Sequence, residues 1–280
     1  MSRPHAAPPL GPGQRDTLVS GVRWRSRERE GTGTPVVFVH GHLASSATWE
    51  DVLRPAAAGH PAIAVDLPGS GASDRPWPYD YSVGGQARGL DAYLAVRGIA
   101  RAVLVGNSLG GATVMALVAE RPDRVAALVL VAPATPHAPI ALPFRVMRRR
   151  PLGEIALALA NRPMAAYGLR HYLYGDPSRV TAHVVDDAWR PLAVPGTRRA
   201  ALAAIRTDPS AFVGLEDLVR RPTLIVWGTR DRLLPPAEAE RLRARIPGSR
   251  VVLLPGAGHL PQREQPEALA RAVAEFVARF

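Results

Sequence analysis

The chain has 280 residues and a mass of 29.9 kDa, which suits one large domain or a core with one insertion and argues against an array of several domains. Apolar residues make up 47% of the sequence, which excludes wholesale disorder, and the lack of cysteine excludes disulfide scaffolds, thiolate metal sites and cysteine nucleophiles. The net charge of +11 comes from arginines spread over the whole chain, with no lysine, and so argues against a nucleic-acid-binding patch.

Residues 1–16 are rich in proline and glycine and predict a flexible N-terminal arm. Apolar and charged side chains then alternate on both sides of Ser20-Gly21, a pattern typical of a β-hairpin with one solvent-exposed face. Six short apolar runs without alternation predict strands that are buried on both faces. These runs are Thr34–Val39, Ala62–Asp66, Ala102–Val105, Ala126–Val131, Pro222–Trp227 and Val251–Leu254.

Helical patterns lie between these strands, at Ser46–Arg54, Val83–Val96, Leu109–Glu120, Ala237–Arg245 and Gln265–Arg279. Such alternation predicts an α/β fold with a mainly parallel sheet covered on both sides. The alternation breaks once, after the sixth strand, where residues 134–217 show helical patches and no buried-strand run. We interpret them as a helical insertion that divides the core into residues 17–133 and 218–280. The basic run Arg145–Arg150 within the insertion is interpreted as a solvated surface segment.

The sharpest chemical signal is Gly106-Asn107-Ser108-Leu109-Gly110, which follows a predicted strand and precedes a predicted helix. A G-x-S-x-G motif in this context forms a turn so tight that the residues two before and two after the serine must lack side chains. Ser108 would then present its hydroxyl at the carboxyl edge of the sheet as a nucleophile. The alternative is an ordinary strand-to-helix turn with a capping serine.

A serine hydroxyl is a poor nucleophile until a base takes its proton, so a histidine is expected nearby in space. His259 follows the last predicted strand, on a loop whose glycines permit a bend toward Ser108. The segment Gly228-Thr229-Arg230-Asp231 comes straight after the strand Pro222–Trp227, and Asp231 would orient the imidazole as the third member of a triad. The alternative for Asp231 is that it caps the helix that begins near Pro236.

Attack by a serine on a carbonyl creates an oxyanion, which two backbone N–H groups commonly bind. The residue after the nucleophile, Leu109, offers one donor, and His42, in the loop after the third strand, offers the other. The His42 side chain either lines the pocket or points into solvent. The sequence predicts no cofactor and no metal site. The histidine pair that could suggest a metal site, His40 and His42, lacks nearby carboxylates in the sequence.

From about residue 17 to its end, the chain resembles the α/β-hydrolase superfamily. The resemblance is carried by His40-Gly41, by Asp66–Asp74, by the Ser108 motif and by the chain order Ser108, Asp231, His259. It implies that the helical insertion is a cap that covers the nucleophile and shapes the pocket, and that the glycines within Asp66–Asp74 serve turns.

Ser108 disfavours two groups of relatives, the haloalkane dehalogenases and epoxide hydrolases, because these carry Asp at the nucleophile position. Asn107 before Ser108 resembles carbon–carbon bond hydrolases of vinylogous diketones, although Leu260 stands where those relatives carry Trp. That resemblance also implies a cap arginine for a substrate carboxylate, and Arg190, after Trp189, is the candidate. We therefore expect Asn107, Trp189, Arg190 and Leu260 in the substrate pocket.

Taken together, these features predict a cofactor-independent serine hydrolase that acts on an ester, lactone or thioester of a moderately apolar small molecule. The alternatives are a carbon–carbon bond hydrolase and a small-molecule receptor on the same fold. No apolar stretch reaches the ~18 residues of a membrane span and residues 1–13 lack the apolar region of a signal peptide, so we expect a cytoplasmic protein without nucleic-acid or membrane partners. The sequence leaves the oligomeric state open.

Overall fold

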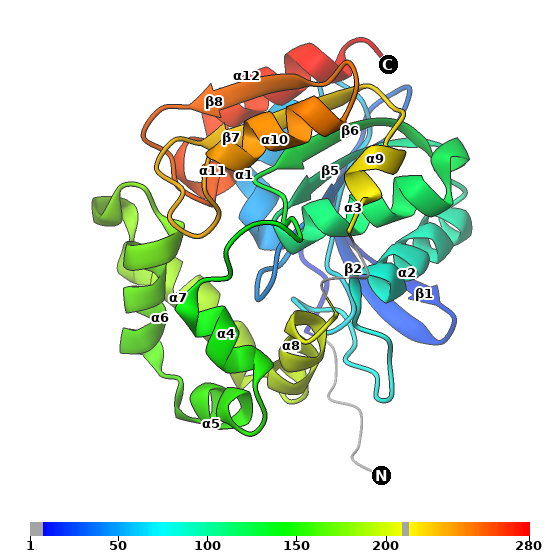
Figure 1. Cartoon of the computed structure of the whole chain (residues 1–280). Coiled ribbons are helices and arrows are strands. Elements are labelled where there is room, and N and C mark those ends of the chain that lie inside the picture. The colour runs from blue at the N-terminus through cyan, green and yellow to red at the C-terminus, as the bar shows by residue number, and fades with distance from the viewer. Residues whose placement is uncertain (1–7, 209–212) are drawn as a thin grey trace.

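The computed structural model of the chain describes residues 8–208 and 213–280 and shows an eight-stranded sheet with helices on both faces (Figure 1). The strands are β1 (Gln14–Val19), β2 (Val22–Arg29), β3 (Val36–Val39), β4 (Ala62–Val65), β5 (Ala102–Asn107), β6 (Val125–Val131), β7 (Thr223–Gly228) and β8 (Arg250–Leu254). Their order in the sheet is β1-β2-β4-β3-β5-β6-β7-β8. β2 pairs antiparallel with β1 and β4, and the pairs from β4 to β8 are parallel. The predicted α/β fold with a mainly parallel sheet is confirmed.

The first strand begins earlier than expected. Residues 14–16 belong to the predicted flexible arm, but they pair with residues 25–27 of β2. The side chain of Arg25 is buried and donates to the carboxylate of Asp16 and to the carbonyls of Pro8 and Pro9, so it fastens residues 8–16 to the sheet. These contacts of Arg25 join residues far apart in the sequence, so the proline-rich composition gave no sign of them. Residues 1–7 of the predicted arm lie outside the described residues.

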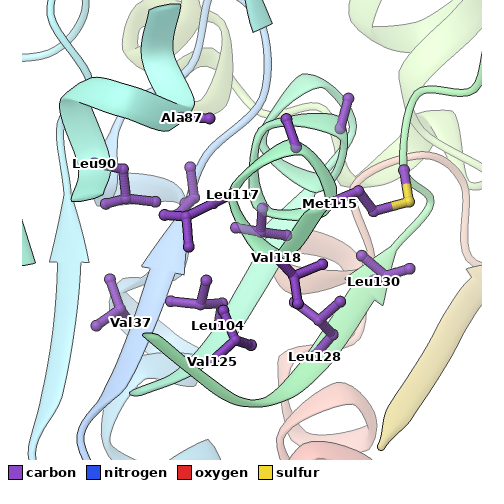
Figure 2. Close-up of a cluster of buried hydrophobic side chains, with 14 of the residues drawn as sticks. Val37, Ala87, Leu90, Leu104, Met115, Leu117, Val118, Val125, Leu128 and Leu130 are labelled. Atoms are coloured by element: carbon purple, nitrogen blue, oxygen red, sulfur yellow. The ribbon is translucent and has the colours of Figure 1, made fainter. Parts of the chain in front are cut away.

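Apolar side chains of the central strands point alternately to the two faces of the sheet, and helices cover both faces, which explains why the apolar runs show no period of two. On one face, Val37 and Leu104 pack with Leu90 of α2 (Val83–Val96) and Leu117 of α3 (Leu109–Glu120), as Figure 2 shows. α10 (Ala237–Arg245) completes that layer. On the other face, α1 (Glu50–Ala56) and α12 (Pro266–Val277) cover side chains that include Phe38.

The helical insertion (residues 134–217) leaves the sheet after β6. Its helical elements are α4 (Leu142–Arg148), α5 (Leu152–Leu159), α6 (Arg162–Gly168), the π-helix η3 (Leu169–Leu173), η4 (Pro177–Arg179), α7 (Ala182–Trp189), η5 (Arg190–Ala193) and α8 (Thr197–Ile205). These elements gather at one end of the sheet, apart from the two layers that cover the core (Figure 1). α9 (Leu215–Leu218), which begins within the predicted bounds of the insertion, instead packs against α3 in the core layer. The sequence patterns did not indicate α4. Across the described ranges, no helix is both long and apolar enough to cross a membrane.

Candidate active site

Ser108 occupies the turn between β5 and α3. Its backbone has φ of 53° and ψ of −121°, a left-handed value that a residue with a side chain adopts only under constraint. The constraint comes from β6 and the loop that follows it: the Ser108 N–H donates to Val131 O at 3.1 Å, and the Ala134 N–H donates to Ser108 O at 2.9 Å. The turn therefore holds a strained serine at the carboxyl edge of the sheet.

Two glycines make this turn sterically feasible. A Cβ at Gly106 would lie 2.5 Å from the carbonyl oxygen of Gly110, and a Cβ at Gly110 would lie 2.4 Å from the carbonyl oxygen of Val39. Both distances are far below contact between a side chain and a backbone oxygen, so neither position can carry a side chain without moving the turn. This close approach is the physical reason for the glycines at the two outer positions of the motif.

His259 and Asp231 face each other across the loops that follow β8 and β7. Nδ1 of His259 donates to Oδ2 of Asp231 at 2.8 Å, and both side chains are almost completely buried. The two loops are joined directly, since the Arg230 N–H donates to Ala257 O at 2.8 Å, and the His259 N–H donates to Leu173 O at 2.7 Å. The imidazole is thus oriented by both its ring and its backbone.

The Asp231 carboxylate is itself held in place by the backbone. Its second oxygen, Oδ1, accepts the N–H groups of Leu233 and Leu234 at 2.8 and 2.9 Å. Helix α10 begins beyond these residues, with Pro236 at its N-cap, so Asp231 does not cap that helix. The carboxylate has one oxygen fixed by its own loop and the other committed to His259.

Nε2 of His259 is the ring nitrogen that would receive a proton from a nucleophile. It is buried and has no hydrogen-bond partner among the described residues, so no bond to the Ser108 hydroxyl is formed here. His259 and Ser108 nevertheless line the same cavity, of about 280 Å³. The residue that carries the free nitrogen and the residue that carries the hydroxyl therefore border the same space.

The loop after β3 brings a second backbone donor beside Ser108. A Cβ built on Gly41 would lie 3.0 Å from the Cβ of Ser108, so the loop backbone runs against the nucleophile turn. Within residues 8–208 and 213–280, the N–H groups of His42 and Leu109 donate no hydrogen bond to the protein. These are the two donors that the sequence predicted for an oxyanion.

The two histidines of this loop have different surroundings. His40 is buried, accepts the Leu67 N–H at Nε2 (3.1 Å), and donates from Nδ1 to Gly41 O (2.8 Å), so it fixes the loop backbone. Burial lowers the pKa of His42 to about 4, with a smaller contribution from His40, so the His42 ring is neutral at pH 7. The His42 ring lines the cavity rather than pointing into solvent, and lies 5.8 Å from the ring of Phe144.

Of the four predicted pocket residues, Asn107 and Leu260 line the 280 Å³ cavity, whereas Trp189 and Arg190 do not. The reason is helical spacing. The cavity-facing positions of α7 and η5 are Val184, Asp187 with Ala188, and Pro191 with Leu192, which recur every three to four residues. Trp189 and Arg190 fall on other faces of this stretch, and the Arg190 side chain is 74% exposed, with Asp186 at 3.8 Å.

Asn107 lies in the cavity wall, where its side chain hydrogen-bonds to three neighbouring segments. It is fully buried, and its amide nitrogen donates to Val131 O at 2.9 Å and to His259 O at 3.3 Å. Its amide oxygen accepts from Nε2 of Gln262 at 3.0 Å. Asn107 and Gln262 therefore connect the serine turn to the loop that carries His259.

Glu264 is a second connection that the sequence did not reveal. Its buried carboxylate accepts the N–H of Gly258, next to His259, at 2.7 Å, and that of Gly175 in the helical insertion at 2.8 Å. Burial raises the pKa of Glu264. Glu264 is the last residue of the short helix α11 (Pro261–Glu264), and no local sequence pattern marks it as this connection.

No group of three or more His, Cys, Asp or Glu side chains that could hold a metal ion occurs in the described part of the chain. We therefore expect EDTA to leave the hydrolytic activity unchanged, because the candidate site consists of a serine, an imidazole, a carboxylate and backbone donors. The measurement is initial rate of ester hydrolysis before and after dialysis against EDTA. A loss of activity that a divalent metal restores would contradict the expectation.

A family model described as the alpha/beta hydrolase fold matches residues 34–266, a span that includes the serine turn, both loops of the site and the helical insertion. The chain belongs to the α/β-hydrolase family. Its fold and its hydrolase-named relatives make it a hydrolase enzyme, as the resemblance in the sequence implied.

Individual relatives differ in their named activities. An uncharacterized protein of Mycobacterium tuberculosis is 30% identical over 261 residues, covering 88% of this chain and 76% of the relative. The pimeloyl-(acyl-carrier protein) methyl ester esterase of Neisseria meningitidis is 29% identical, covering 90% of this chain and 97% of the relative. The structure of haloalkane dehalogenase DbeA from Bradyrhizobium elkani superposes with a TM-score of 0.81 at 26% identity, covering 95% of this chain and 97% of that chain.

Proposed function

We propose that this α/β-hydrolase is a cofactor-independent serine hydrolase that cleaves an ester, lactone or thioester of a moderately apolar small molecule through an acyl-enzyme. One observation carries the proposal. The buried His259–Asp231 pair, joined at 2.8 Å, leaves Nε2 of the imidazole without a partner, and His259 lines the same cavity as the strained Ser108. This is the arrangement that a serine nucleophile requires.

In the proposed acylation step, Ser108 Oγ attacks the substrate carbonyl while its proton passes to Nε2 of His259. The bond between Oγ and carbonyl carbon forms, and the carbonyl π electrons become an oxyanion held by the N–H groups of His42 and Leu109. The oxyanion then collapses, the bond to the leaving oxygen breaks, and His259 gives its proton to the departing alcohol. The Ser108 hydroxyl reaches Nε2 only as the substrate complex forms, as is common for catalytic hydrogen bonds that are long or open in free enzymes.

Deacylation repeats these steps with water. His259 removes a proton from the water, whose oxygen attacks the acyl carbon, and the same proton returns to Ser108 Oγ as the acid departs. In both steps Asp231 stabilises the imidazolium and keeps Nδ1 protonated, so that Nε2 can accept. The two backbone bonds to Asp231 Oδ1 hold that carboxylate in position.

We propose that the helical insertion acts as a cap over this site. Its residues Phe144, Leu169 and Leu192 form part of the cavity wall opposite the loops of the core. An apolar cover of this kind limits water around the oxyanion, which strengthens its hydrogen bonds. It also favours a moderately apolar leaving group.

The ester assignment has support from the chain's own residues and from one relative. Ser108 stands at the nucleophile position, and the relative from Neisseria meningitidis is named as an ester hydrolase. Arg190, the arginine that the carbon–carbon bond hydrolase alternative named for a substrate carboxylate, lies outside the larger cavity.

The test is a panel of p-nitrophenyl esters from acetate to decanoate, assayed beside a vinylogous diketone. We expect sustained turnover of the shorter esters and little or no cleavage of the diketone. Faster cleavage of the diketone would favour the carbon–carbon bond hydrolase. A stoichiometric burst of p-nitrophenol without further turnover would favour a receptor and contradict the proposal.

A further inference from the structure

A second cavity, of about 120 Å³, adjoins the one that contains His259. The two cavities share four wall residues, His42, Ser108, Phe144 and Leu233, so they meet at the candidate nucleophile. Otherwise their walls differ. The larger cavity is lined by the loop after β3 together with α6, η3 and α7, and the smaller one by the loop after β6 together with α4 and α8.

The position of His259 assigns the two halves of a substrate to the two cavities. His259 lines only the larger cavity, and it is the group that must protonate the departing alcohol. Of these two cavities, Leu109, whose N–H is a proposed oxyanion donor, lines the smaller one. With the carbonyl carbon at Ser108, the leaving group therefore extends into the larger cavity and the acyl chain into the smaller one.

The smaller cavity contains one permanently charged residue, Arg148. Apart from Arg148, its wall is mainly apolar, and its two threonines already donate their hydroxyl protons, from Thr135 to Glu238 at 3.0 Å and from Thr207 to Ala204 O at 2.8 Å. His42 is neutral at pH 7, since its pKa is about 4. Arg148 is thus the strongest hydrogen-bond donor that faces this space.

Arg148 has no carboxylate partner in the part of the chain that the structure describes. The acidic side chain on the adjoining helix α5, Glu154, is taken by two bonds from Arg206, both of 2.7 Å. The larger cavity differs in this respect, because its arginine, Arg263, forms an ion pair with Asp187 at 2.8 Å. Arg148 is half-buried as a residue, and an arginine in that setting without a counter-ion favours an anionic ligand, since burying an unpaired charge is costly.

We propose that Arg148 binds a carboxylate at the far end of the substrate's acyl chain, so that the preferred substrates are half-esters of short dicarboxylic acids. This inference rests on the proposed serine hydrolase function, and it specifies the acid half of the substrate. A cavity of 120 Å³ holds about four groups of the size of water, at roughly 30 Å³ each, which suits an acid of four to six carbons. Guanidinium and carboxylate form a paired, charge-assisted contact that fixes the chain end.

The first experiment compares monobenzyl glutarate with the benzyl ester of glutaric acid monoamide, which has the same shape without the charge. We expect the wild-type enzyme to hydrolyse the charged ester with a kcat/KM at least tenfold above that of the amide, and Arg148→Gln to bring the ratio close to one. Arg148→Lys should give an intermediate ratio. Arg149→Gln is the matched control, since Arg149 is exposed, lies next in the chain and lines neither cavity.

The second experiment measures binding without turnover. In the Ser108→Ala background, calorimetry should show at least tenfold tighter binding of monobenzyl glutarate than of its amide, and this difference should vanish when Arg148→Gln is added. Hydrolysis of both esters at equal efficiency would overturn the carboxylate site and leave the hydrolase function standing. Arg148-dependent binding without hydrolysis of either ester would support the carboxylate site and overturn the hydrolase function. Equal binding of both ligands would overturn the carboxylate site, whether or not the esters are hydrolysed.

Discussion

Ser108→Ala is expected to lower kcat/KM for the best p-nitrophenyl ester by roughly a millionfold, the size of loss seen when the nucleophile of a comparable triad is removed. The alanine removes only Oγ, which makes no hydrogen bond to the protein in the described structure. It keeps the Cβ and therefore the same backbone strain, so the melting temperature should change little. Steady-state rates and a thermal melt together measure both effects.

A fluorophosphonate probe gives an independent readout, since it forms a covalent bond with an activated serine. The wild-type protein should be labelled, and Ser108→Ala should not. Ser45→Ala is a matched control, because Ser45 also lines the larger cavity, and it should retain labelling. Persistent labelling of Ser108→Ala would show that another residue is the nucleophile.

The sheet and its flanking helices could be predicted from the sequence because their signals are local. The expected helices at 83–96, 109–120 and 237–245 coincide with α2, α3 and α10. The strand runs are recognisable because both faces of the sheet are covered, which makes nearly every residue of a central strand apolar. Helix α4 gave no comparable signal, since it has only seven residues and arginines of a basic run interrupt its apolar ones.

The basic run shows what composition alone could not resolve. Arg145, Arg149 and Arg150 are exposed, as expected for a solvated segment, but Arg148 turns toward the smaller cavity. The difference between these neighbours depends on how α4 is oriented against α8 and the loop after β6. A single sequence carries no information on that orientation.

The predicted site residues also divide into those that their position after a strand could place and those whose position depends on tertiary packing. Ser108 directly follows β5, and Asp231 and His259 lie in the loops that follow β7 and β8, so a parallel sheet brings them to one edge. Trp189 and Arg190 were assigned from a resemblance, without knowledge of which face of α7 meets the cavity. The clamps made by Gln262 and Glu264 join residues that are 155 and 89 positions apart, and no local pattern marks such pairs.

Asp231→Asn is expected to lower kcat/KM by roughly ten-thousandfold with the fold intact, by analogy with the same change in a chymotrypsin-type triad. The structure gives the reason for this chain. The Asn oxygen would remain on the N–H groups of Leu233 and Leu234, which now bond Asp231 Oδ1. The amide nitrogen would then replace Oδ2 and face Nδ1 of His259.

An amide N–H that faces Nδ1 requires that nitrogen to accept, so the imidazole proton moves to Nε2. In that tautomer Nε2 cannot take the proton of Ser108, and the nucleophile stays a neutral hydroxyl. Rotating the amide by 180° does not restore the wild-type imidazole tautomer, because the NH₂ group would then face the two backbone N–H groups. Asp217→Asn is the control, since it changes an exposed ion pair with Arg245 and should alter kcat/KM little. Near-wild-type turnover in Asp231→Asn would show that the carboxylate only shapes its loop, and the orienting acid would have to be sought elsewhere, beginning with Asp187 in the wall of the larger cavity.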